Sequence, residues 1–439
     1  MKLPKAPPTQ GSLIAEVSPP RLIQILHEGP EWARHDALHL HWDELRFKTP
    51  PEGYSHAEWW LGLKLARKAS LREVPLRDKE GHPFEFSVPD SLNELVHQID
   101  RELGDRFGLT DGKVTAQDKR VYVANSIIQE SITSSQLEGA VTTREVAKKM
   151  IQTGRQPRDK SERMILNNYQ TMSRIREVLD RELTPGLILE LHRIATEGTL
   201  EREETSGRLR LPDEVVEVSD AYGEVFHSPP PATELPARIQ ALCDFANGRN
   251  TDTFIHPIVR AIIVHFALAY DHPFVDGNGR TARALFYWCM LRQKYPLFEY
   301  ISISQFLLKA PGQYYRAFLH TETDDNDLTY FLLHQAGVIR AAVGELKAYI
   351  AQRADEQLQT NRMLRGSDRL NLRQQAVIGH ALRNPDNVYD IRIHQSGQRI
   401  SYQTAHDDLV GLVKLGLLIM QKRGRKFQFL VPGDLPDRL

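Results

Sequence analysis

The chain has 439 residues, of which 41% are hydrophobic and 26% are charged, and its formal net charge is −1. This length predicts a folded protein of two to four domains. A charge so close to neutral excludes a molecule that binds nucleic acid or a membrane surface through its overall charge.

The chain also lacks the sequence features of an exported or membrane protein. Its N-terminus has no apolar run of the kind found in signal peptides, and its longest apolar stretches, such as 261–270, are too short to cross a bilayer. The two cysteines, Cys243 and Cys289, lie inside apolar segments, which predicts buried thiols and no disulfide framework. We therefore expect a cytoplasmic protein that makes no membrane contact.

Residues 1–115 are predicted to form an N-terminal accessory domain that is largely helical. Four of the five tryptophans lie between residues 21 and 115, in a region that mixes helical periodicity with short polar loops. Within it, residues 91–107 place their apolar side chains on one helical face. The pattern is typical of packing and indicates no chemistry of its own.

Residues 116–345 are predicted to form a helical domain that is interrupted once. Thr184-Pro185 is a helix start, and the segment 208–228 has the valines, the alternation and the central turn of a β-hairpin. A helix that is apolar on all sides begins at His256-Pro257, which predicts that it is central. It stops at residues 272–280, HPFVDGNGR, and a further helix follows directly.

The remaining residues are predicted to be a linker helix at 346–365 and a winged-helix domain at 366–439. Residues 362–439 carry 13 Lys and Arg against 7 Asp and Glu, so this end of the chain is basic. In a winged helix, residues 401–416 would be the recognition-type helix and residues 422–426 the wing. The basic wing favours contact with DNA phosphates, whereas contact with a protein is the alternative.

The run HPFVDGNGR has the composition of a phosphate-binding loop. Gly277 and Gly279 permit unusual backbone angles and close approach of a ligand, and the helix that follows points its free N–H groups at the loop. Arg280 and Arg283 share one face of that helix, which suits a di- or triphosphate. The run is neither a Walker A motif nor a Rossmann fingerprint, because no strand precedes it.

Three other side chains of the run predict what the loop does with a phosphate. Asp276 would repel phosphates unless a cation such as Mg²⁺ lies between them. His272 is the one group of the run that titrates near neutral pH, so it is a candidate general base for an incoming hydroxyl. Asn278 can donate a hydrogen bond to a phosphate oxygen.

The segment HPFVDGNGRTAR (272–283) closely resembles the signature His-x-Phe-x-Asp/Glu-Gly-Asn-Gly-Arg-x-x-Arg of the Fic family. The resemblance covers roughly residues 118–340 and implies a mainly α fold, namely a Fic-type helical core with a β-hairpin flap. It implies transfer of AMP from ATP to a Ser, Thr or Tyr hydroxyl of a protein, with release of pyrophosphate. Gly279 favours nucleotidyl transfer, because phosphoryl-transferring relatives carry Lys at that place.

The resemblance also implies a role for each signature residue. His272 would take the proton of the target hydroxyl, and Asp276 would hold Mg²⁺. The phosphates of ATP would be cradled by Gly277, Asn278, Gly279 and Arg280, with Arg283 on the γ-phosphate. Tyr314 and Tyr315 resemble a tyrosine pair that often lines the nucleotide pocket of the family, although such a pair is also typical of a core.

A second segment, 131–143, resembles the inhibitory helix of the family, Ser/Thr-x-x-x-Glu-Gly/Asn. Ser134 and Glu138 lie on one helical face, and Gly139 is placed to end that helix. The resemblance implies an inhibitory helix near 126–139 whose Glu138 pairs with Arg283 and so misplaces ATP. The alternative role for Glu138 is to position water for the removal of AMP.

We therefore predict a protein adenylyltransferase that uses ATP and Mg²⁺ and is inhibited by its own helix. The alternatives are a nucleotide-sensing regulator that binds DNA and an enzyme that transfers a different group. One predicted partner is a protein with a target hydroxyl, and in the case of self-modification that protein is this chain itself. The other is a second copy of the chain in an inhibited homodimer. The hairpin at 208–228, with Val215, Val216 and Val218 on its edge, is expected to pair with the target as an added strand.

Overall fold

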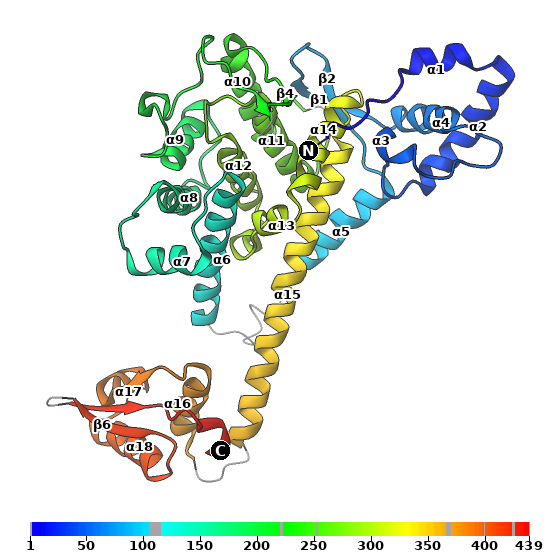
Figure 1. Ribbon diagram of the computed structural model, residues 1–439. Coiled ribbons are helices and arrows are strands. Elements are labelled where there is room, and N and C mark those ends of the chain that lie inside the picture. Colours follow the sequence, from blue (N-terminus) through cyan, green and yellow to red (C-terminus); the bar gives the residue numbers. More distant parts are fainter. Residues whose placement is uncertain are drawn as a thin grey trace. The chain divides into compact units, whose positions relative to one another are not determined.

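The computed structural model describes residues 2–104, 116–219, 223–251, 253–365, 370–398, 400–423 and 426–438. Helices dominate this part of the chain, as predicted, and its strands form small sheets of two or three (Figure 1). The chain divides into two compact units. One contains Met1–Phe107 and Ala116–Leu346, and the other contains Lys347–Leu439. The residues before 105 and after 115 belong to the same compact unit, so this division shows no boundary there. The predicted domain boundary at residue 115 stays a prediction.

The N-terminal part of the first unit is a set of helices with one antiparallel hairpin, and this hairpin was not predicted. Its tryptophans pack together as expected, with Trp60 fully buried and Trp32, Trp42 and Trp59 around the same cluster. The elements are α1 (Gln10–Glu16), α2 (Pro19–His35), α3 (Trp42–Leu45), α4 (His56–Lys68), β1 (Arg72–Arg77), β2 (Pro83–Phe86) and α5 (Asp90–Gly104).

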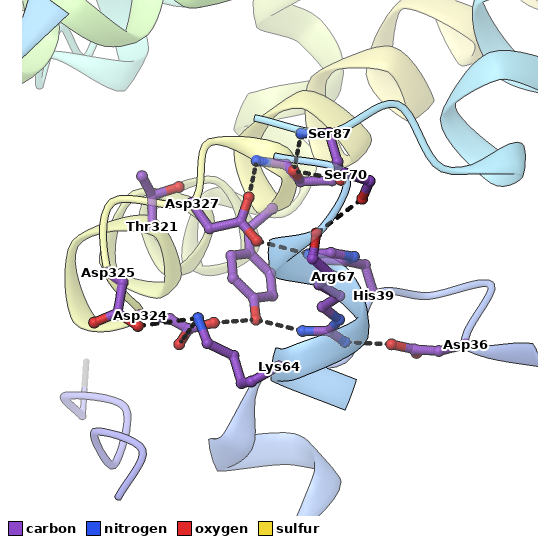
Figure 2. A network of polar contacts seen from close by, with 12 residues as sticks. Asp36, His39, Lys64, Arg67, Ser70, Ser87, Thr321, Asp324, Asp325 and Asp327 are labelled. Atoms are coloured by element: carbon purple, nitrogen blue, oxygen red, sulfur yellow. Dashed lines mark hydrogen bonds and ion pairs between the residues drawn. The ribbon is translucent and has the colours of Figure 1, made fainter. Parts of the chain in front are cut away.

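A buried polar network joins this N-terminal part to the segment at 324–330 (Figure 2). His39 Nε2 lies 2.9 Å from Asp327 Oδ2, and Lys64 Nζ lies 2.8 Å from Asp324 Oδ1. Arg67 hydrogen-bonds Tyr330 at 3.0 Å and pairs with Asp36. Because buried charges are costly unless all are paired, these contacts fix the N-terminal helices to the rest of the unit.

The remainder of the first unit is the helical core that the sequence predicted. Its helices are α6 (Ala116–Leu137), α7 (Arg144–Thr153), α8 (Lys160–Glu177), α9 (Pro185–Thr196), α10 (Leu235–Ala246), α11 (Pro257–Asp271), α12 (Asn278–Arg292), α13 (Ser304–Lys309) and α14 (Pro311–Thr323). Short 3₁₀ turns are η1 (Glu203–Thr205), η2 (Ala232–Glu234) and η3 (Pro296–Tyr300).

Helices α11 and α12 lie side by side at the centre of this core (Figure 1). His256 caps α11 and Pro257 occupies its first position, as the sequence predicted. Nearly every residue of α11 is buried, which confirms that an all-round apolar helix is central. Helix α12 contacts α6, α8 and α9, so the loop between α11 and α12 is held from several sides.

The predicted hairpin is present but much shorter than 208–228. Its strands are β3 (Val218–Ser219) and β4 (Val225–His227), and residues 220–222 of the predicted turn lie outside the described residues. Residues 208–217 are not a strand, because Arg202 and Arg208 both pair with Glu214 and fold that stretch into a turn. Val215 is exposed and Val216 half-buried, but only Val218 belongs to the strand edge.

The second unit contains the C-terminal part of α15 (Thr329–Arg365), which is longer than the predicted linker helix because it begins in the core. It continues with α16 (Leu372–Arg383), β5 (Val388–Tyr389), α17 (Ile391–Gln398), α18 (Tyr402–Lys414), β6 (Ile419–Arg423), β7 (Lys426–Leu430) and η4 (Leu435–Arg438). Its strands form a sheet ordered β5-β7-β6. The winged-helix assignment stays a prediction, and residues 424 and 425 of the wing lie outside the described residues.

Both cysteines behave as the sequence predicted. Cys243 and Cys289 are free and buried, and burial raises the pKa of each thiol to about 12. Across the residues that the structure describes, no helix is both long and apolar enough to cross a bilayer.

Candidate active site

The loop between α11 and α12 has a backbone that its sequence requires. His272 ends α11 with φ 44°, and Gly277 precedes α12 with φ 87°. A Cβ on Gly277 would lie 2.6 Å from Thr196 Cγ2, so the position needs glycine for space as well as for its backbone angle. Phe274 is fully buried, which anchors the loop in the core.

His192, on α9, supports this loop and was not predicted. Its ring stacks on Phe274 with centroids 3.7 Å apart. Gly207 N–H donates to Nδ1, so Nε2 carries the proton and donates to the Asp276 carbonyl at 2.9 Å. Burial lowers the pKa of His192 to about 4, so the ring is neutral at physiological pH. Its place 80 residues before the loop gave the sequence no local signal for this role.

His272 is arranged to accept a proton. Its Nδ1 lies 3.2 Å from the Ala269 carbonyl, an acceptor, so Nδ1 carries the proton and Nε2 holds a lone pair. Burial lowers the pKa of His272 to about 4, against the smaller opposing effect of the hydrogen bond to Ala269. The imidazole is therefore neutral at physiological pH, which is the form that a general base needs.

Asn278 uses its side chain inside the loop. Its Oδ1 accepts from Phe274 N–H at 2.9 Å, and its Nδ2 donates to the Phe274 carbonyl at 2.8 Å. Because an amide NH2 group has a second hydrogen, the prediction that this side chain donates to a phosphate stays a prediction. Asn278 also offers a ligand its backbone N–H, at the first position of α12.

Arg280 and Asp276 lie on the same turn with different exposure. Arg280 is buried and donates from Nη1 to the Ala195 carbonyl at 2.6 Å, but its Nε and Nη2 have no hydrogen-bond acceptor. Burial lowers the pKa of Arg280. The Asp276 side chain is 48% exposed, and its Oδ1 lies 3.7 Å from Arg280 Nη2. Two unsatisfied guanidinium nitrogens next to an exposed carboxylate suit a phosphate and its cation.

The guanidinium of Arg283 is held by Ser134 and Glu138, which lie shortly before Gly139. Its Nη2 lies 2.7 Å from Glu138 Oε1 and 2.9 Å from the Ser134 carbonyl, and its Nε donates to Ser134 Oγ at 2.8 Å. Burial alone would lower the pKa of Arg283, but the Glu138 carboxylate raises it above its usual range. Helix α6 ends at Leu137, so Glu138 projects from the helix end as the sequence predicted.

One cavity of about 400 Å³ brings most of these residues together. His272, Gly279, Arg283 and Glu138 line it, and so do both tyrosines of α14. Tyr314 is buried and hydrogen-bonds His265 at 2.9 Å, whereas Tyr315 is 39% exposed. The other lining residues are Val218, Ser219, Phe226, His227, Ala269, Tyr270, Phe318, Leu319 and Glu322. The flap strands β3 and β4 thus form part of the wall.

Residues 182–290 match the Fic/DOC family. The chain carries a Fic domain. Over 213 residues it is 28% identical to a protein of Nematostella vectensis named "Protein adenylyltransferase Fic", an alignment that covers 46% of each chain. Over 70 residues it is 39% identical to the Drosophila melanogaster protein of the same name, covering 16% of this chain and 14% of that one. The chain thus spans about half the length, or less, of these curated relatives.

Solved structures show that the Fic domain has the expected fold. A Fic family protein from Desulfovibrio desulfuricans G20 matches with a TM-score of 0.55 at 21% identity, covering 79% of this chain and 97% of that one. Fic-1 (aa134–508) from C. elegans matches with a TM-score of 0.50 at 17% identity, covering 78% and 92%. At these identities the likeness concerns the fold alone.

The close approach of Glu138 to Gly279 gives a prediction about stability. A Cβ on Gly279 would lie 2.2 Å from Glu138 Oε1. In the first turn of a helix, alanine is otherwise preferred to glycine by up to about 1 kcal/mol. We expect Gly279→Ala to lower the melting temperature of the protein, because the new methyl group drives the carboxylate off Arg283. The same substitution should cost less in a Glu138→Gly background, where Arg283 Nη1, 3.0 Å from the new Cβ, is the close neighbour that remains. Equal shifts in both backgrounds would contradict the contact with Glu138.

The lowered pKa of His272 gives a prediction about pH. We expect the His272 signal in NMR spectra of histidine-labelled protein to titrate near pH 4, well below the usual value of 6.5. Because the folded state binds this proton more weakly than the unfolded state does, the ring's contribution to stability is lost as the pH falls from about 6.5 towards 4. His272→Ala assigns the signal, and a midpoint near 6.5 would contradict the burial argument.

Proposed function

We propose that the chain is a protein adenylyltransferase that transfers AMP from ATP to a protein hydroxyl and is restrained by Glu138. The observation that carries the proposal is the meeting of His272, the first turn of α12 and Arg283 in one cavity. A base, a set of helix N-terminal N–H groups and a buried arginine are what nucleotidyl transfer to a hydroxyl requires. The relatives named protein adenylyltransferase support the same activity.

In the proposed reaction the phosphates of ATP lie against the start of α12. The N–H groups of Asn278 and Gly279 and the unsatisfied guanidinium of Arg280 hold them, with Arg283 on the γ-phosphate once Glu138 has moved away. The target oxygen attacks the α-phosphorus while its proton passes to His272 Nε2. The bond from the α-phosphorus to the bridging oxygen breaks, and pyrophosphate leaves. Tyr314 and Tyr315 would form the wall of the cavity next to the nucleobase of ATP.

A divalent cation fits the residues present. The Asp276 carboxylate is a hard oxygen donor, half exposed beside the helix start, and Mg²⁺ is commonly held by one carboxylate together with substrate phosphates. When bound, Mg²⁺ would neutralise charge on the α- and β-phosphates. It would also screen these phosphates from Asp276.

The proposed brake follows from the position of Glu138. Its carboxylate occupies the space over Gly279 and pairs with Arg283, so a γ-phosphate cannot use the same guanidinium. ATP that is bound without this contact would have a misplaced α-phosphate, and small misplacements cost large factors in rate. The brake would act within one chain, because α6 and α12 belong to the same unit.

The partners of the proposed enzyme are ATP and a protein with a reactive hydroxyl. Self-modification is supported by the high effective concentration of a protein's own surface hydroxyls. DNA contact through the C-terminal unit rests on the basic residues of the sequence near β6 and β7, and the inhibited homodimer rests on the resemblance. Both stay predictions.

Labelled ATP tests the proposed reaction. Glu138→Gly protein is incubated with Mg²⁺ and ATP that carries the label on either its α- or its γ-phosphate. We expect protein-bound label from the α-position alone, because the γ-phosphate leaves in pyrophosphate. Glu138→Gly/His272→Ala protein is the control and should take up almost none. Protein-bound γ-label would indicate phosphoryl transfer instead, and no label from either form would indicate a nucleotide sensor.

A further inference from the structure

Two sets of polar contacts join α6 and its C-terminal end to α12. The first is the contact of Arg283 with Ser134 and Glu138 described above. One turn further along α12, the Tyr287 hydroxyl donates to Glu130 Oε2 at 2.9 Å. Tyr287 follows Arg283 by four residues, and Glu130 precedes Ser134 by four, so both sets of contacts lie on the same faces of the two helices. The helices are therefore joined at matching intervals.

Glu130 is the more completely held of the two glutamates. It is 2% exposed, whereas the Glu138 side chain is 25% exposed. Besides Tyr287, its carboxylate accepts from Ser302 Oγ at 2.8 Å, from Ser304 N–H at 3.0 Å and from Ser304 Oγ. Three elements meet at this one side chain, namely α6, α12 and the start of α13.

This arrangement fixes the register of α6. Sliding α6 by one residue moves its side chains by about 1.5 Å along the axis and turns them by about 100°. Such a shift would leave the buried hydroxyls of Ser302 and Ser304 without the Glu130 carboxylate, which is costly, and would leave Tyr287 only the Ile301 carbonyl at 3.3 Å. It would also break the 2.7 Å contact between Glu138 and Arg283, eight residues further along.

We propose that Glu130 is a positioning residue that locks α6 onto α12 and so holds Glu138 on Arg283. The part of this inference that concerns activity rests on the proposed function, whereas the lock itself is a property of the fold. It follows that whatever releases the site must disrupt the contacts of Glu130 or free the end of α6 beyond them.

The lock is tested by amide hydrogen exchange on the full chain. Glu130→Ala removes the acceptor of the whole cluster, and Tyr287→Phe removes one hydroxyl while keeping the ring. We expect exchange in residues 131–138 to quicken about tenfold or more in Glu130→Ala and less in Tyr287→Phe, with α12 unchanged. Glu130→Gln, which keeps an acceptor oxygen, should restore most of the protection. Exchange in 131–138 that is unchanged in both Glu130→Ala and Tyr287→Phe would overturn the proposal.

Its effect on activity is tested with α-labelled ATP in two backgrounds. We expect Glu130→Ala to raise labelling several-fold over the wild type but to give no rise in a Glu138→Gly background, since both act through Arg283.

Asp327→Ala is the matched control, a buried carboxylate of the same unit in another network (Figure 2), and should lower stability without raising labelling. Equal changes from Glu130→Ala in both backgrounds would show that Glu130 only stabilises the fold. If Glu138→Gly labels nothing, the proposed function fails, and the exchange data still decide the lock.

Discussion

Glu138→Gly is expected to raise the rate of AMP transfer by about 10²-fold or more. The substitution removes the carboxylate that lies 2.7 Å from Arg283 Nη2 and occupies the space over Gly279. It leaves Arg283 buried and still held by Ser134, so the guanidinium stays in position for a phosphate. The rate is measured as α-label incorporated into protein at saturating ATP.

The control for this substitution is Glu145→Gly, which removes an exposed glutamate from the first turn of α7. It loses the same charge without touching Arg283, so its rate should equal that of the wild type. Equal rates for Glu138→Gly and the wild type would refute the brake.

His272→Ala in the Glu138→Gly background is expected to lower the transfer rate by about 10²- to 10⁴-fold. The effect should fall on kcat, because the imidazole is proposed to take the proton of the target hydroxyl and not to hold ATP. Single-turnover labelling, together with an ATP titration by calorimetry, separates the two quantities. A fall in ATP affinity that accounts for the whole loss would contradict the role of His272 as base.

A second histidine in the same cavity provides the comparison. His227 Nδ1 lies 2.7 Å from Glu322 Oε2, and its Nε2 lies 2.7 Å from the Tyr270 carbonyl. Because both ring nitrogens face oxygen acceptors, neither holds a lone pair toward a substrate. His227→Ala should therefore lower kcat far less than His272→Ala, and an equal loss would show that the assignment of the base is wrong.

The parts of the site that could be predicted are those coded within a few residues. The glycines, His272 and the arginine spacing in 272–283 indicated a helix start built for phosphate, and the structure has that helix start. The contact between Glu138 and Arg283 joins residues 145 apart, so spacing alone could not give it. It was predicted only through the resemblance to the Fic family.

The parts that could not be predicted depend on packing between distant segments. The loop uses the amide of Asn278 to satisfy the buried backbone of Phe274, which the sequence did not indicate. Nothing near His192 in the sequence indicates that it supports this loop. The hairpin was predicted too long because its valines favour strands, whereas the ion pairs of Glu214 fold the preceding residues into a turn.

Polar residues were also harder to place than apolar ones. The central position of α11 followed from its apolar sides, and the clustering of the N-terminal tryptophans agrees with a packing role. In the sequence, Glu130 looks like an ordinary glutamate of a helix. Only the structure shows that it is buried and accepts hydrogen bonds from several hydroxyl groups. Which acceptor a buried donor finds depends on how distant segments pack in the folded protein.

Under the proposed brake, Arg283 serves either Glu138 or a γ-phosphate. The most direct test of this claim is the Kd of ATP and of ADP, measured by calorimetry for the wild type and for Glu138→Gly. Since a charge-assisted hydrogen bond to the γ-phosphate is worth about 1.5–3 kcal/mol, the preference for ATP over ADP should rise about tenfold or more in Glu138→Gly. An unchanged preference, with both nucleotides tightening equally or not at all, would contradict the claim.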